Sequence, residues 1–168
     1  MFRMIVILAS LAAVPALATE PLEKFGWFSG VVGACWQGTF PDGKTRHTHC
    51  YTVQFGQFIR GTATLSAERD GVMRDVFSGD SLFAWDDKDQ KIAYYVWGSD
   101  GTHGTHEAHY EGRDLSFPVL SKKEPGKVAF RSLWRRVDGD SFEVHRQVPE
   151  GSGWKTELTV VYMRVPEG

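Results

Sequence analysis

The sequence predicts an all-β fold, a single antiparallel up-and-down meander barrel of about ten strands with a short N-terminal helix or plug. From residue 32 onward, short runs rich in Val, Thr, Phe, Tyr and Trp alternate with turns rich in Gly, Asp, Pro and Lys. Their spacing of roughly 8 to 12 residues is typical of sandwiches and barrels. The connections are too short for the crossovers that parallel strands need.

The first eighteen residues have the pattern of a secretory signal peptide. Arg3 precedes an apolar run over 4–14, and Ala16-Leu17-Ala18 supplies small residues for cleavage. The apolar run is shorter than the roughly 20 residues that a spanning helix needs. We therefore expect residues 1–18 to be removed and residues 19–168 to form one barrel domain, periplasmic or secreted, without a transmembrane segment.

Charge and size exclude some classes of function. The 19 basic and 21 acidic residues give a formal net charge of −2, and the basic residues are scattered along the chain. Nucleic-acid-binding proteins show a basic patch or stripe instead, so we expect no nucleic-acid partner. The length supports one compact domain with its own core.

The segment before the first strand, "EPLEKFGWFSGVVG", carries four large apolar residues: Leu22, Phe25, Trp27 and Phe28. A short helix or 3₁₀ turn here would plug one mouth of the barrel. An irregular lead-in that covers a sheet edge is the alternative. The predicted strands that follow are 32–40, 45–55, 57–66, 72–85, 90–98, 103–111, 114–120, 127–137, 141–148 and 154–165.

The first hairpin defines a register. If "PDGK" is a four-residue loop centred on Asp42-Gly43, then Phe40 and Thr45 form the first hydrogen-bonded pair and Cys35 faces Cys50. The two cysteines then occupy a non-hydrogen-bonded pair, where Cα atoms approach to about 4.5 Å, a distance that a disulfide accepts. A three-residue loop with a bulge would shift this pairing by one residue.

The same register separates the two faces of the hairpin. Period-two alternation places the cysteines on a mostly polar face, which we expect to be the outer one. The disulfide should therefore clamp the first two strands from outside. The opposite face, expected to point inward, collects Trp36, Gly38, Phe40, His47, His49, Tyr51, Val53 and Phe55.

These features resemble the calycin group of barrels, which includes lipocalins and fatty-acid-binding proteins. The closest likeness is to uncharacterised exported bacterial domains of lipocalin-like type. The resemblance is carried by "CWQGTFPDGKTRHTHCY", "FAWDDKDQKIAYYVWGSDG" and "GSGWKTELTVVYMRV". It implies an antiparallel barrel that can hold a ligand in its interior. Fatty-acid-binding proteins bind a carboxylate with an Arg-x-Tyr pair on the last strand, and here the order is reversed as Tyr162-Met163-Arg164, for which a salt bridge at the barrel end is the alternative.

The histidines offer candidate metal ligands. Side chains two residues apart on a strand point the same way, so His47 and His49 could converge on one ion, with His145 as a possible third ligand. Haem-binding relatives of these barrels use an axial histidine, which keeps haem open as well. Interior histidines bonded to neighbours or to a ligand, and solvated histidines at a turn, are the alternatives. "HEAH" at 106–109 is one residue short of the zincin motif and does not lie in a helical pattern.

We find no nucleophile elbow, phosphate-binding loop or dinucleotide fingerprint, so nothing in the sequence points to an enzyme or requires a cofactor. The expected function is binding of a small apolar or amphipathic molecule against Trp36, Phe40, Tyr51 and Phe55. A polar end of that molecule would be oriented by His47, His49, Tyr162 or Arg164. The alternatives are a metal- or haem-binding barrel that uses His47 and His49, and a structural or interaction module without a ligand.

Overall fold

The computed structural model describes residues 20–166, so the predicted signal peptide at 1–18 lies outside the described residues. A short helix, α1 (Glu20–Glu23), and a 3₁₀ helix, η1 (Gly26–Val31), precede the strands. The strands are β1 (Ala34–Thr39), β2 (Thr45–Gln54), β3 (Phe58–Arg69), β4 (Val72–Asp86), β5 (Lys91–Gly98), β6 (His103–Glu111), β7 (Asp114–Leu120), β8 (Val128–Arg136), β9 (Ser141–Glu150) and β10 (Gly153–Arg164).

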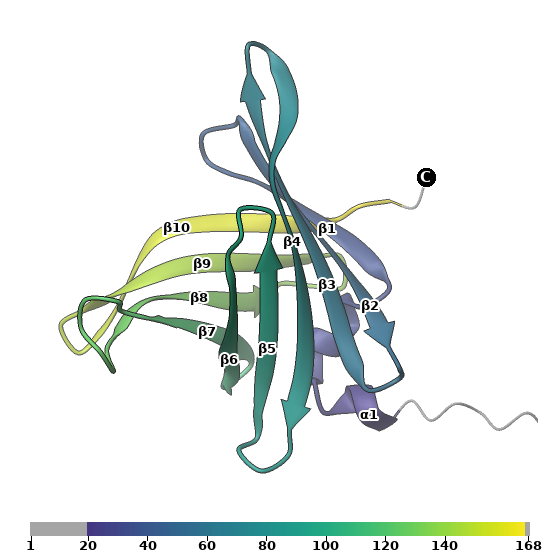
Figure 1. Cartoon of the computed structure of the whole chain (residues 1–168), viewed down its shortest axis with the longest axis vertical. Coiled ribbons are helices and arrows are strands. Elements are labelled where there is room, and N and C mark those ends of the chain that lie inside the picture. The colour runs from purple at the N-terminus through teal and green to yellow at the C-terminus, as the bar shows by residue number, and fades with distance from the viewer. Residues whose placement is uncertain (1–19, 167–168) are drawn as a thin grey trace, which may run out of the picture.

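The strands form a closed antiparallel barrel in which each pairs with its neighbours in sequence and β1 pairs with β10 (Figure 1). The predicted fold class is therefore confirmed. The predicted and observed strands differ most at the end of β3, expected at 66 and observed at Arg69. Asp70 and Gly71 both adopt positive φ, which forms a tight hairpin turn and continues the pairing to Arg69 and Val72.

The β1–β2 hairpin has the predicted register. The backbone N–H of Phe40 donates to the carbonyl of Thr45 at 2.9 Å, and Cys35 pairs with Cys50. The Asp42 carboxylate accepts from the backbone N–H groups of Lys44 and Thr45, and Gly43 takes a φ of 67°. Since the side chain of Asp42 stabilises this turn and glycine permits the positive φ, the four-residue loop forms.

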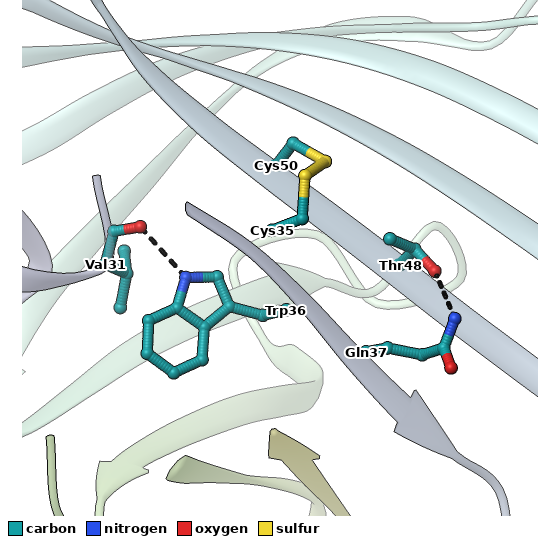
Figure 2. The surroundings of a disulfide bond; sticks show 6 residues. All are labelled: Val31, Cys35, Trp36, Gln37, Thr48 and Cys50. Atoms are coloured by element: carbon teal, nitrogen blue, oxygen red, sulfur yellow. Dashed lines mark hydrogen bonds between the residues drawn. A yellow bond between two sulfur atoms is a disulfide. The ribbon is translucent and has the colours of Figure 1, made fainter. Parts of the chain in front are cut away.

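The Cys35–Cys50 disulfide is present, with a Cα–Cα distance of 4.0 Å. Figure 2 shows the disulfide and the indole of Trp36 on opposite sides of β1. Trp36 is only 2% exposed and belongs to the core. Because neighbouring residues of a strand face opposite ways, the disulfide lies on the outer face, as predicted.

The N-terminal segment plugs one end of the barrel, which confirms the helical alternative. Phe25 and Phe28 of this segment are fully buried, and the carbonyl of Phe25 accepts a hydrogen bond from the hydroxyl of Tyr110. The ring of Phe28 makes edge-to-face contacts with Tyr51, Phe83 and Trp134 at centroid distances of 5.3, 4.9 and 6.0 Å. The plug and the inner faces of several strands therefore share one aromatic core.

The barrel is loosely joined between β6 and β7. These strands pair at only three positions, His109–Glu111 with Ser116–Asp114, although β6 has 9 residues and β7 has 7. Figure 1 shows the two strands diverging beyond this short contact. The two strands are therefore paired beside the plug and not toward the opposite end of the barrel.

Candidate ligand-binding site

The barrel interior contains a cavity of about 610 Å³. Its lining comes from β2 to β5 and from β7 to β10, together with Phe40 and part of the β5–β6 turn. Most of the lining is aromatic or aliphatic; its larger aromatic members include Phe77, Phe83, Tyr94, Phe117 and Trp134. Such a lining with a few polar groups is typical of small-molecule sites.

Three side chains of β2 form a row inside the barrel, as the alternation predicted. The rings of His47 and His49 lie 4.1 Å apart, and the ring of His49 stacks on Tyr51 at 5.8 Å with an interplanar angle of 5°. All three residues line the cavity. The row therefore presents two imidazoles and a phenol along one wall.

Tyr162 of β10 joins this row. Its hydroxyl lies 2.9 Å from Nδ1 of His47, and its ring is 5.7 Å from that of His49. Gly38 of β1 pairs with both His47 and Tyr162, and a Cβ atom there would lie 2.5 Å from Cγ1 of Val160 and 3.1 Å from Cζ of Tyr162. The missing side chain at position 38 thus leaves the space that Tyr162 occupies beside His47.

The hydroxyl of Tyr51 is buried and has no hydrogen-bond partner among the described residues. Tyr51 is 1% exposed, and burial raises the pKa of its phenol well above the ordinary value, with a smaller contribution from Tyr162. A Cβ atom at Gly61 would lie 3.0 Å from Cε1 of Tyr51 and 2.6 Å from Oγ of Ser81. A glycine therefore makes room for this tyrosine, as Gly38 does for Tyr162.

The histidines of the row are neutral groups at neutral pH. Burial lowers the pKa of His49 well below 6.5, and the nearby His47 lowers it further; burial also lowers the pKa of His47. Desolvation disfavours the charged imidazolium, and no described carboxylate is hydrogen-bonded to either ring to offset it. The two imidazoles of the row consequently offer hydrogen bonds without a formal charge.

The cationic side chain that lines the cavity is Arg146 of β9. It is already engaged, because its guanidinium pairs with the carboxylate of Glu157 and lies 4.6 Å from the ring centroid of Phe130. Sequence reasoning did not single out Arg146. The alternation along β9 could have found it, since Phe142 and Val144 also face inward.

Four residues expected at the ligand or metal site do not line the cavity: Trp36, Phe55, His145 and Arg164. Phe55 is 84% exposed, because β2 ends at Gln54 and the chain turns there, with the N–H of Gln57 bonded to the carbonyl of Gln54. Val53, expected inward, is also exposed. The inward alternation of β2 thus ends at Tyr51.

Trp36 and Arg164 lie at the plug end of the barrel rather than at the cavity. The indole N–H of Trp36 donates to the carbonyl of Val31 at 2.9 Å, and its ring packs on Phe142 at 5.3 Å. Arg164 is exposed and its guanidinium lies 5.6 Å from the Trp36 ring centroid. Of the Tyr162-Met163-Arg164 segment, only Tyr162 reaches the cavity lining.

His145 is separated from His47 and His49. It bonds to the hydroxyl of Thr159 at 2.9 Å and lies 3.0 Å from a carboxylate oxygen of Glu143, on the face opposite to the cavity-lining Val144 and Arg146. Within residues 20–166, no three His, Cys, Asp or Glu side chains are grouped in a way that could hold a metal ion. The "HEAH" segment is part of β6, where the His106 ring stacks on Tyr94 at 5.3 Å.

A scan against models of known protein families and a search of curated proteins find no match to this chain. The closed ten-stranded antiparallel barrel is compatible with a calycin-like fold. No helix in the described part of the chain has the length and hydropathy needed to cross a membrane.

Proposed function

We propose that this protein is an exported barrel of calycin type that binds a small apolar or amphipathic molecule in its interior. The observation that carries this proposal is the aromatic-lined cavity of about 610 Å³. Its lining includes Tyr51, whose buried hydroxyl has no hydrogen-bond partner in the described part of the chain. Cavities of roughly 300 to 1,000 Å³ are typical of sites for small molecules. The apolar part of a ligand would gain by leaving water, and the row on β2 would orient a polar end.

Export is supported by two independent features. The segment 1–18 has the charge, apolar run and small residues of a cleaved leader. The Cys35–Cys50 disulfide suits an oxidising compartment. Mass spectrometry of the protein from fractionated cells tests this part: a mature chain that begins at Thr19 outside the cytoplasm supports export, and an uncleaved cytoplasmic chain contradicts it.

Ligand binding can be tested by filling the cavity. Ala63 lines the cavity, whereas its neighbour Thr62 is exposed on the outer face. The probe is N-phenyl-1-naphthylamine, an uncharged dye whose emission rises in apolar surroundings. We expect saturable binding to the wild type and to Thr62→Trp, and loss of binding in Ala63→Trp. Binding that is equal in both variants, or no binding to the wild type, would contradict the proposal.

A second candidate function is binding of a metal ion or haem. It is favoured by the 4.1 Å separation of the His47 and His49 rings within the cavity wall. Metal analysis and an absorption spectrum of protein purified without a histidine tag separate the two functions. Stoichiometric metal or a Soret band, lost in His47→Ala and His49→Ala, would favour this second candidate.

A further inference from the structure

The Tyr51 hydroxyl is a buried polar group that has no hydrogen-bond partner among residues 20–166. Two nearby hydroxyl groups form their hydrogen bonds elsewhere: Ser81 Oγ donates to the carbonyl of Gly61 at 3.2 Å, and the Tyr162 hydroxyl is bonded to His47. Buried polar groups are nearly always hydrogen-bonded. Four buried side-chain polar atoms of the described residues have no partner, and only that of Tyr51 belongs to a residue that lines this cavity. This position points to a partner from outside the chain. Gly61 allows the Tyr51 ring and Ser81 to pack closely, because a Cβ at this position would lie 3.0 Å from Cε1 of Tyr51 and 2.6 Å from Oγ of Ser81.

The charges around the cavity decide what kind of partner this is. Among the described lining residues, the charged groups are one cation and two carboxylates. Arg146 is paired with Glu157, Asp80 is paired with Arg60, and Asp100 accepts a hydrogen bond from the backbone N–H of Thr102. Arg164 lies at the plug end beside Trp36. A carboxylate seated at Tyr51 would therefore be a buried charge without a free countercharge, which is strongly unfavourable. An uncharged group would carry no such penalty.

The aromatic side chains that line the cavity near Tyr51 suit a flat ligand. Phe83 stacks on Tyr94 at 5.3 Å with an interplanar angle of 24°, and Phe117 contacts Trp134 at 4.8 Å. All four rings line the cavity. Aromatic rings favour offset-stacked and edge-to-face partners, so these walls favour an aromatic or otherwise flat ligand over a flexible chain.

We propose that the ligand is a flat, uncharged apolar molecule with a hydroxyl or carbonyl group, and that the Tyr51 hydroxyl binds that group. This inference rests on the proposed function and specifies its ligand class. Tyr51 would be a specificity-determining residue: it would discriminate between polar ends, while the aromatic walls would bind the apolar body.

The test uses three ligands that share one flat body: pyrene, 1-pyrenemethanol and 1-pyrenecarboxylate. Binding is followed by energy transfer from tryptophan to pyrene. We expect 1-pyrenemethanol to bind the wild type most tightly and 1-pyrenecarboxylate most weakly. In Tyr51→Phe the affinity for 1-pyrenemethanol should fall about fivefold to tenfold, the range of one neutral hydrogen bond, while the affinity for pyrene stays unchanged.

Tyr51→Phe removes a hydroxyl that is bonded to none of the described residues, so the variant should fold as the wild type does, which a thermal melt checks. Tyr95→Phe removes a half-exposed hydroxyl outside the cavity lining and is the matched control, expected to bind all three ligands as the wild type does. Tighter binding of the carboxylate, or an unchanged alcohol affinity in Tyr51→Phe, would overturn this inference while pyrene binding upholds the proposed function. Absence of binding by all three ligands would overturn the proposed function itself.

Discussion

His47 and Tyr162 are joined across an intervening strand. Nδ1 of His47 on β2 lies 2.9 Å from the hydroxyl of Tyr162 on β10, although 115 positions separate the two residues in sequence. Between them runs β1, whose Gly38 pairs with both. The hydrogen bond therefore spans β1 at the β1–β10 pairing that closes the barrel. It connects this pairing to the cavity wall.

Loss of this hydrogen bond should weaken the barrel. In Tyr162→Phe the partly buried His47 loses its partner, and we expect the free energy of unfolding to fall by about 1 kcal/mol, the usual net value of such a bond. Urea unfolding measures the change. Tyr95→Phe, at a half-exposed position, is the control and should change the free energy little. Equal effects of the two substitutions would show that the His47–Tyr162 bond is not formed in solution.

A side chain at position 38 should disturb the same place by crowding. The Cβ of Gly38→Ala would lie 2.5 Å from Cγ1 of Val160, so Val160 and Tyr162 must shift. We expect a loss of about 1 to 3 kcal/mol in the free energy of unfolding, as for other overpacked sites. Gly139→Ala is the control, because a Cβ there meets no atom within 4 Å. A chemical-denaturation series on both variants would contradict the prediction if they were equally stable.

The first hairpin shows how much could be predicted from the sequence. The "PDGK" turn and the two cysteines fix one register, and that register places His47, His49 and Tyr51 on the inner wall, where the structure has them. Local turn chemistry and period-two alternation are enough for this, because they depend on residues close together in the chain. The same logic predicted all ten strands.

Other positions depend on three-dimensional features that alternation does not contain. Phe55 continues the inward pattern of β2 but lies beyond the last paired residue, Gln54, where the chain turns outward. Trp36 faces inward but at the level of η1, where its indole donates to the carbonyl of Val31, and Arg164 is exposed beside the Trp36 ring. Both positions depend on how far η1 enters the barrel. The unpaired Tyr51 hydroxyl could not be predicted either, since it requires knowledge of every neighbour.

The plug should be a main source of stability. Phe28 is fully buried among Tyr51, Phe83 and Trp134. Removal of a buried phenylalanine ring typically costs 3 to 5 kcal/mol, so we expect about that loss in the free energy of unfolding for Phe28→Ala. Phe55→Ala deletes the same ring at an exposed turn and should cost less than about 0.5 kcal/mol. Similar losses in both variants, measured by denaturant unfolding, would mean that the plug does not pack as described.

The disulfide should stabilise the barrel without contributing to binding. It closes a loop with a sequence separation of 15 on the outer face, and loops of that size gain about 3 kcal/mol from a cross-link. We expect Cys35→Ala/Cys50→Ala to lose about that much stability and to bind N-phenyl-1-naphthylamine as the wild type does. The double variant avoids a free thiol. A large loss of probe affinity in a folded double variant would show that the outer clamp shapes the cavity.

The buried histidines should make stability depend on pH in one defined window. Burial lowers the pKa of His49, and less strongly that of His47, below the ordinary value of 6.5. Below pH 6.5 the unfolded chain therefore binds protons that the folded histidines do not bind. The free energy of unfolding must then rise with pH up to about 6.5 and level off above it, with a slope of at most about 1.4 kcal/mol per pH unit for each histidine.

Substitution of His49 isolates its share of this dependence. His49→Phe keeps a ring in contact with Tyr51, Trp134 and Tyr162 but cannot bind a proton, so its stability should change less between pH 5 and 6.5 than that of the wild type. His103→Gln replaces an exposed histidine of β6 and should retain the wild-type slope. Carboxylates with lowered pKa values, such as those of Asp42 and Asp138, act at lower pH and lie outside this window. Denaturant unfolding at several pH values measures the slopes, and an unchanged slope in His49→Phe would mean that His49 is not buried as a neutral group.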